Sequence, residues 1–210
     1  MRTRTLFIGA ALFISASLNA QSGFTFGAKA GLNLTNLIGD NTGTGHTGFH
    51  VGAIGNYGFG KNGNASVLGE MLFDTKGWKD DVGKTWNLSY IDIPIMFRYR
   101  FYFGMYAEGG LYVGFLAGAS SDGKSEVDIA VTDSTSRRVK VIDALNGSDL
   151  GFIGGIGYIH PKGFGIGWRY SVGLKNIDKN ADPNSPLGVG SVDVNVAMQF
   201  SVKYYFNWGK

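Results

Sequence analysis

Apolar and polar side chains alternate with a period of two along most of this chain, and this alternation is the feature that most limits its fold. In the clearest segment, every second residue from Ile91 to Phe101 is large and apolar, while Asp92, Arg98 and Arg100 lie between them. Successive side chains of a strand point to opposite faces of a sheet. The pattern predicts eight strands, at 24–34, 49–59, 67–75, 90–101, 105–117, 150–158, 164–174 and 192–208.

Charged residues fall on only one side of each predicted strand. The apolar faces carry no Asp, Glu, Lys or Arg, whereas the opposite faces carry seven basic and five acidic residues. These residues are Lys29, Glu70, Asp74, Lys76, Asp92, Arg98, Arg100, Glu108, Arg169, Lys175, Asp193 and Lys203. Because the two signs nearly balance, we expect a network of ion pairs where these faces meet.

The connections between the strands indicate which face points inward, since a soluble barrel or sandwich would alternate in the same way. Predicted connections are long at 35–47, 77–85, 119–148 and 177–190, and short at 60–64, 102–104 and 160–163. Outer-membrane barrels combine short periplasmic turns with longer outer loops. Aromatic residues gather at the short-turn end, which predicts an interfacial girdle. The girdle comprises Tyr57, Phe59, Tyr99, Phe101, Tyr204, Phe206 and Trp208.

This asymmetry predicts an all-β fold: an eight-stranded antiparallel up-and-down transmembrane β-barrel with its apolar faces toward lipid. A basic side chain facing lipid at mid-depth costs about 2 to 4 kcal/mol, and a closed sheet pairs every backbone group. Eight strands enclose a space that side chains can fill. We therefore expect a filled polar lumen without a wide pore. Pro94 cannot donate to a ladder, so we also expect a bulge there.

The first twenty residues predict a targeting segment. Arg2 and Arg4 precede a short uncharged apolar run that ends at Ser17. Ala20 is a small residue of the kind found just before a signal-peptide cleavage site. A membrane anchor would need about 18 or more apolar residues. We expect a cleaved signal peptide at 1–20 and a barrel domain at 21–210, located in the outer membrane of a Gram-negative-type cell envelope.

Composition excludes several other classes of protein. The 210 residues include 34 glycines without a Gly-X-Y period and no cysteine, which excludes collagen, disulfide frameworks and thiolate chemistry. The 19 basic residues fall to 17 without Arg2 and Arg4, against 16 acidic residues. With so little net charge, no nucleic-acid partner is expected.

Four segments resemble the PorT-like outer-membrane β-barrel family. They are GAKAGLN at 27–33, GEMLFDTKG at 69–77, YIDIP at 90–94 and RYSVGL at 169–174. The resemblance covers essentially the whole mature chain and implies an eight-stranded outer-membrane barrel in which the proline after Ile93 belongs to the family's pattern. It implies little about activity, since most members have no known biochemistry and one branch is associated with protein secretion. The end of the chain departs from the usual terminal aromatic, because Asn207-Trp208-Gly209-Lys210 follows Phe206.

Candidate catalytic and binding motifs are few. His46 and His50 lie near the first outer loop, and Glu70 is a conceivable partner for His50 in a lipid hydrolase or a pH sensor; the competing interpretation makes His50 an ordinary member of the polar interior. The glycine-rich run 151–157 mimics a dinucleotide fingerprint but lies within a predicted strand. The alternating Asp and Asn residues of 178–184 could offer oxygens to calcium, although a solvated loop is favoured. We expect no catalytic residue, metal or cofactor.

The 119–148 connection predicts a hairpin, because Val127, Ile129 and Val131 alternate before a turn and Val139 and Val141 alternate after it. Its edge could accept a partner strand by β-augmentation, or the hairpin could simply stiffen the loop.

Two functions remain for the whole protein. The first is a non-enzymatic, monomeric barrel that contacts outer-membrane lipids and presents its outer loops to a protein or glycan partner. The alternative is a narrow channel for small solutes, constricted by Arg98, Arg100 and Arg169.

Overall fold

The computed structural model describes most of the predicted barrel. The described residues are 23–38, 44–59, 64–79, 84–122, 124, 126–132, 135–140, 142, 145–175, 194–206 and 208. The predicted signal peptide at 1–20 lies outside them. No helix long and apolar enough to cross a bilayer occurs in this described part of the chain.

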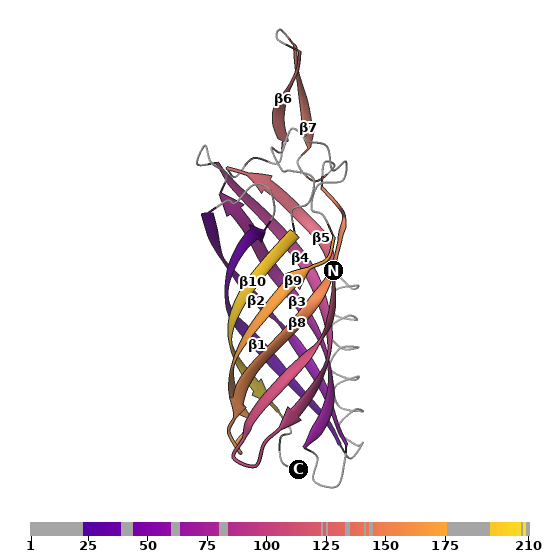
Figure 1. Cartoon of the computed structure of the whole chain (residues 1–210), viewed down its shortest axis with the longest axis vertical. Helices are drawn as coiled ribbons and strands as arrows, with labels where there is room; N and C mark the ends of the chain where they lie inside the picture. The colour runs from indigo at the N-terminus through magenta and orange to yellow at the C-terminus, as the bar shows by residue number, and fades with distance from the viewer. Residues whose placement is uncertain are drawn as a thin grey trace, which may run out of the picture.

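Eight strands close into one antiparallel barrel, which confirms the predicted fold class (Figure 1). They are β1 (Phe24–Ile38), β2 (Thr44–Phe59), β3 (Ala65–Lys79), β4 (Thr85–Arg100), β5 (Met105–Ser121), β8 (Ser148–Ile159), β9 (Phe164–Gly173) and β10 (Val194–Tyr205). Neighbours around the barrel follow the order β1-β10-β9-β8-β5-β4-β3-β2. Pairing of β1 with both β2 and β10 closes the sheet, so no barrel strand is left with a free edge.

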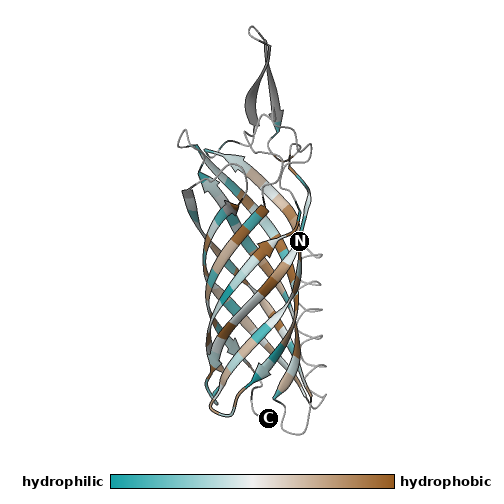
Figure 2. Cartoon of the chain, in the orientation of Figure 1, coloured by the Kyte–Doolittle hydropathy of each residue, from teal (hydrophilic) through white to brown (hydrophobic). Residues whose placement is uncertain are grey.

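The period-two alternation sorts side chains between the wall and the interior. Leu32, Met71 and Ile95 are 59%, 62% and 61% exposed on the outer surface. Their neighbours Asn33, Glu70 and Met96 are buried in the lumen, and the strands are accordingly banded by hydropathy in Figure 2. Apolar side chains on the outside and charged ones inside are the arrangement that a hydrocarbon environment favours.

Several strands extend further toward the loop end than the sequence predicted. β1 continues to Ile38, β3 continues to Lys79, and β4 begins at Thr85. The first two outer connections therefore shrink to 39–43 and 80–84, and their predicted lengths were wrong. Ladder pairing continues past the apolar alternation, for example between Trp78 and Trp86, because strands beyond a bilayer need no apolar outer face.

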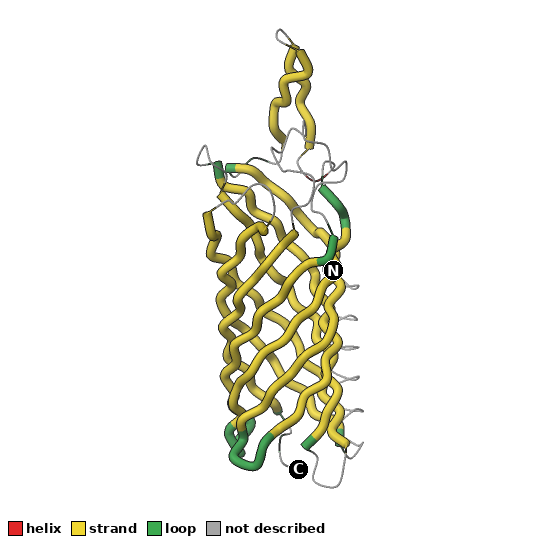
Figure 3. Tube along the Cα trace, in the orientation of Figure 1, coloured by secondary structure: helices red, strands yellow, loops and turns green. Residues whose placement is uncertain are grey.

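The opposite end carries the short turns, drawn in green in Figure 3. Residues 101–104 join β4 to β5, and 160–163 join β8 to β9. Gly104 and Gly163 both have φ of 90°, a backbone conformation that glycine adopts without a side-chain penalty. By the rule that periplasmic turns are short, this end faces the periplasm.

The bulge expected at Pro94 does not form. Gly69 pairs with Ile95 and Leu72 pairs with Asp92, so the β3–β4 register is the same on both sides of the proline. Pro94 also keeps a regular partner on β5, Tyr112. The sheet therefore accommodates the backbone N–H that Pro94 lacks without an extra residue in β4. Register shifts occur elsewhere, between Ser89 and Tyr90 and within 45–50.

A separate two-stranded hairpin projects from the loop end of the barrel (Figure 1). It consists of β6 (Glu126–Thr132) and β7 (Thr135–Lys140), which pair only with each other among the described strands. The hairpin lies within the connection where the sequence predicts one. It forms a sheet of its own, however, and does not continue the ladder of β5 and β8.

Candidate functional site

The barrel interior brings most of the predicted charged residues together, and a shared arginine lies at its centre. Arg169 of β9 donates through both terminal nitrogens to Glu70 of β3, each at 2.7 Å. Its Nε donates at 2.5 Å to Glu108 of β5. The side chains of all three residues are 0% exposed. A planar guanidinium suits such a paired recognition of two carboxylates.

The same network continues across the lumen on both sides of Arg169. Arg98 of β4 donates to Glu108 Oε2 from Nε at 2.9 Å and from a terminal nitrogen at 2.7 Å, and it donates to Tyr205 Oη at 2.6 Å. Lys29 Nζ lies 3.3 Å from Glu70 Oε2. The chain of contacts thus joins β1, β3, β9, β5, β4 and β10. We call it the central network. Lys203 of β10 lies beside it, with Nζ 2.7 Å from Tyr106 Oη.

A second charged group lies closer to the loop end of β3. Lys76 Nζ is 2.8 Å from Asp92 Oδ2 and 3.9 Å from Asp149 Oδ2. Tyr112 Oη donates to Asp149 Oδ2 at 3.0 Å, and the ammonium of Lys76 lies 4.8 Å from the centroid of the Tyr112 ring. One lysine therefore holds two carboxylates that come from β4 and β8. We call this set the outer group.

His50 is an ordinary member of the polar interior and does not pair with Glu70. Its Nδ1 lies 2.6 Å from Asn33 Oδ1, while Asn33 Nδ2 donates in turn to Asp74. Gln199 donates to the other oxygen of Asp74 at 3.0 Å. Glu70 is held by Arg169 and Lys29 and is not free to act as a base for His50.

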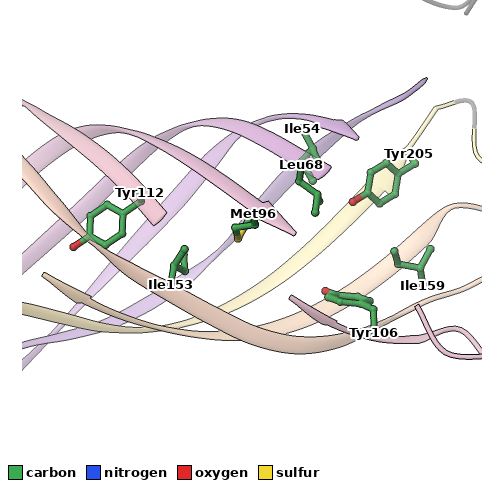
Figure 4. Close-up of a cluster of buried hydrophobic side chains, with 8 residues drawn as sticks. All are labelled: Ile54, Leu68, Met96, Tyr106, Tyr112, Ile153, Ile159 and Tyr205. Carbon is green, nitrogen blue, oxygen red and sulfur yellow. The ribbon is translucent and has the colours of Figure 1, made fainter. Parts of the chain in front are cut away.

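Two apolar clusters fill parts of the interior beside the charged side chains. At the loop end, Trp78 and Trp86 stack with ring centroids 5.6 Å apart and planes 10° apart. Leu145, from the connection between β5 and β8, packs into this cluster together with Leu88 and Tyr90. Figure 4 shows the second cluster, which comprises Ile54, Leu68, Met96, Tyr106, Tyr112, Ile153, Ile159 and Tyr205. Trp208 packs against it from the periplasmic end.

Glycines make the room that these long side chains occupy. A Cβ at Gly155 would lie 2.7 Å from Arg169 Cγ, and one at Gly165 would lie 2.9 Å from Lys203 Cγ. A Cβ at Gly157 would collide with the hydroxyl of Tyr106. The high glycine content therefore serves the packing of the lumen, because no other residue leaves this space beside a large partner.

Two of the predicted interior residues, Arg100 and Lys175, do not join the described ion pairs. Arg100 is half-buried at the periplasmic mouth, with its guanidinium 4.9 Å from the centroid of the Trp208 ring. Lys175 is exposed and donates to Ser148 Oγ at 2.9 Å, because β9 ends two residues earlier. Asp193 lies outside the described residues.

Asp149 is a further interior residue that the sequence pattern does not indicate, because it precedes the predicted start of its strand at 150. With this correction, the buried charges of the described residues are five of each sign. The basic ones are Lys29, Lys76, Arg98, Arg169 and Lys203, and the acidic ones are Glu70, Asp74, Asp92, Glu108 and Asp149. The interior is thus closer to neutrality than the predicted seven and five.

Six of the seven predicted girdle residues lie on the outer surface at the short-turn end. Tyr57, Phe59, Tyr99, Phe101, Tyr204 and Phe206 are all exposed. Neighbouring rings contact one another, as Tyr204 does with Phe164 and Phe206. Trp208 is the exception, because it folds under the barrel against Tyr205, with ring centroids 4.9 Å apart.

The remaining sequence motifs form no reactive site in the described residues. No group of three or more His, Cys, Asp or Glu residues is placed to hold a metal there. The glycine-rich run 151–157 lies inside β8, without the helix that a dinucleotide fingerprint opens. The residues 178–184 that suggested calcium lie outside the described part of the chain.

The closed sheet, its apolar outer wall and its ion-paired lumen define the class of protein: an integral outer-membrane β-barrel. The model of the outer membrane protein beta-barrel domain family matches residues 19–179. The chain belongs to this family, and its location is the outer membrane. No curated protein matches the sequence.

Solved structures with a similar fold include three outer-membrane proteins. Ail of Yersinia pestis, crystallised with the heparin analogue sucrose octasulfate, is 15% identical, with 87% of this chain and 99% of Ail covered and a TM-score of 0.47. Neisserial surface protein A is 14% identical, with 88% and 98% covered and a TM-score of 0.48. The translocator domain of the autotransporter NalP from Neisseria meningitidis is 11% identical, with 97% and 96% covered and a TM-score of 0.37.

Proposed function

We propose that this protein is a non-enzymatic, monomeric outer-membrane barrel with a sealed lumen, and that its outer loops act in surface interaction or in the structure of the envelope. The observation that carries the proposal is the central network. Arg169, Glu70 and Glu108 bridge opposite walls with contacts of 2.5 to 2.7 Å. Water or solute passing along the axis would have to separate fully buried charges. Leaving a buried charge without its partner is costly.

Conductance in planar bilayers tests the sealed lumen. We expect no ohmic single-channel steps from the wild-type barrel, because buried ion pairs and apolar clusters together fill the lumen. The informative variant is Arg98→Ala, which removes a side chain from the cross-section. Lys175→Ala is the matched control, since this cation is exposed. Ohmic steps in the wild type that change with Arg98→Ala but not with Lys175→Ala would favour a narrow channel for small solutes.

The enzyme alternative has a direct chemical test. A lipid hydrolase would need a base beside a nucleophile, whereas His50 is bound to Asn33 in the interior. We therefore expect the mass profile of lipid A to be the same in cells with and without the protein. Loss of an acyl chain only when the protein is present would overturn the non-enzymatic proposal.

The β6–β7 hairpin is the strongest candidate for contact with a protein or glycan. Each of its strands pairs on one side only among the described residues, and Figure 1 shows it projecting beyond the barrel rim. Unpaired strand edges can accept a partner strand. Replacing residues 124–140 by a short Gly-Ser linker should reduce binding of bacteria displaying the protein to glycan arrays and to host extracellular-matrix proteins. Unchanged binding on every surface would argue against the loop as the contact site.

We propose, more specifically, that the chain belongs to the PorT-like outer-membrane β-barrel family. The supporting residues are Lys29, Glu70 and Arg169, which occur in three of the four resembling segments and meet in one ion-paired set. Secretion of a reporter cargo by strains with and without the protein tests whether it shares the secretion role of one branch. Equal secretion by both strains would exclude that role.

A further inference from the structure

A long groove crosses the lipid-facing wall of the barrel near its periplasmic end. It has a volume of about 900 Å³ and runs over β8, β9, β10 and β1. Two parallel ridges of outward side chains border it. One ridge follows the paired residues Tyr158, Ile166 and Val202, and the other follows Ile156, Trp168 and Phe200. Each ridge runs along the hydrogen-bonding direction of the sheet.

The floor between the ridges is almost bare backbone. Gly157 pairs with Gly167, Gly167 pairs with Ser201, and Ser201 pairs with Gly31. These small residues belong to the inward phase of their strands, and all four border the groove. Because barrel strands tilt by about 35 to 45°, a channel along their pairing direction runs obliquely through the membrane. Its shape therefore suits an extended hydrocarbon chain.

A second pocket, of about 620 Å³ and lined mainly by aromatic side chains, adjoins the groove at the periplasmic rim. Tyr158 borders both spaces. The pocket is bordered by Arg100, the turn at 101–104 and Trp208, and no acidic residue borders it. Arg100 is half-buried and forms no ion pair with a described carboxylate; its guanidinium faces the ring of Trp208. The rim thus holds a basic group without an acidic partner directly beside an apolar groove.

We propose that these two spaces together bind one anionic phospholipid of the periplasmic leaflet. Its phosphate lies against Arg100 in the rim pocket, and one acyl chain lies between the two ridges. Guanidinium groups recognise phosphate oxygens by paired hydrogen bonds. An anionic headgroup is preferred over a zwitterionic one, because the pocket offers no carboxylate to a headgroup ammonium. The groove lies in the membrane-facing wall, so hydrocarbon rather than water is what covers it.

Native mass spectrometry of the purified full barrel in detergent tests the proposal. The probes are palmitoyl-oleoyl phosphatidylglycerol, the corresponding phosphatidylethanolamine, and inorganic phosphate. We expect one phosphatidylglycerol per barrel, bound about tenfold more tightly than phosphatidylethanolamine, with no retained inorganic phosphate. Arg100→Gln should weaken phosphatidylglycerol binding about tenfold, which is the usual scale for losing a charge-assisted hydrogen bond. Lys162→Gln is the matched control, because Lys162 is exposed in the neighbouring turn and does not border the pocket.

A second pair of variants tests the groove separately from the headgroup. Ala30→Trp places a large ring at the β1 end of the groove, whereas Ala53→Trp places it on an exposed outward position of β2 outside the groove. Only Ala30→Trp should weaken phosphatidylglycerol binding, by several-fold or more. Heat-modifiable mobility in SDS gels checks that every variant folds. Equal binding of both lipids, the same loss from Lys162→Gln as from Arg100→Gln, or a dimer in place of the lipid-bound monomer would each overturn the proposal.

Discussion

Glu108 is the position where the interior network makes its sharpest energetic prediction. Its carboxylate accepts one hydrogen bond from Arg169 and two from Arg98, at 2.5, 2.9 and 2.7 Å. Glu108→Gln keeps the shape of the side chain but removes the charge that two buried guanidinium groups share. Breaking a buried ion pair by removing one partner costs about 3 to 5 kcal/mol. Since the glutamine oxygen can still accept one hydrogen bond, we expect about 3 kcal/mol.

Urea unfolding in phospholipid vesicles measures this loss. Tryptophan fluorescence follows the transition, and the free energy of unfolding comes from linear extrapolation. Lys175→Gln is the control, because the sequence pattern places Lys175 in the same interior set whereas the structure places it at the surface. Its effect should stay within about 0.5 kcal/mol. A loss below about 1 kcal/mol for Glu108→Gln, or equal losses for the two variants, would refute the reasoning.

Three further substitutions probe the lipid-facing wall, the stacked tryptophans at the loop end and the long loop. Ile95→Arg puts a charge on a lipid-facing position that is 61% exposed and should lower the free energy of unfolding in vesicles by about 2 to 4 kcal/mol; a neutral result would place this face away from lipid. Trp86→Ala removes a ring stacked on Trp78 and should cost about 3 to 5 kcal/mol in the same assay. Leu145→Ser should release the connection between β5 and β8, seen as several-fold faster trypsin cleavage at the exposed Lys124 and Lys140 with little change in barrel unfolding.

The alternation predicts the strands well because lipid imposes it on every outward position. Beyond the lipid, the alternation no longer marks the ends of the strands. The Trp78–Trp86 pair lies in the extension of β3 and β4 beyond the predicted strands, where outward residues such as Lys79 are no longer apolar. The alternation also assigns residues to the interior beyond the part of the lumen in which side chains are buried. Arg100 and Lys175 share that phase, yet one lies at the mouth and the other is exposed.

The partners within the lumen could not be predicted from the chain. Arg169 and Glu70 are 99 residues apart, and they meet only because the barrel closes with one particular register. The groove has the same origin, since Gly157, Gly167 and Ser201 become one floor only when β8, β9 and β10 pair as they do. Asp149 escaped prediction for a different reason. It lies at the second position of β8, before the apolar alternation begins.

The buried charges of the described interior sum to zero, but the basic and acidic residues are divided unequally between its two charged layers. Around the central network, four cations (Lys29, Arg98, Arg169 and Lys203) face only Glu70 and Glu108. Toward the loop end, Lys76 is shared by Asp92 and Asp149, while the side-chain amides of Asn33 and Gln199 hold Asp74. In each layer the minority charge is shared by several partners, so its removal leaves more than one buried ion without compensation. Removing one of the majority charges relieves repulsion as well as breaking a contact. Glu70, Glu108 and Lys76 are therefore the charges on which the sealed lumen depends most.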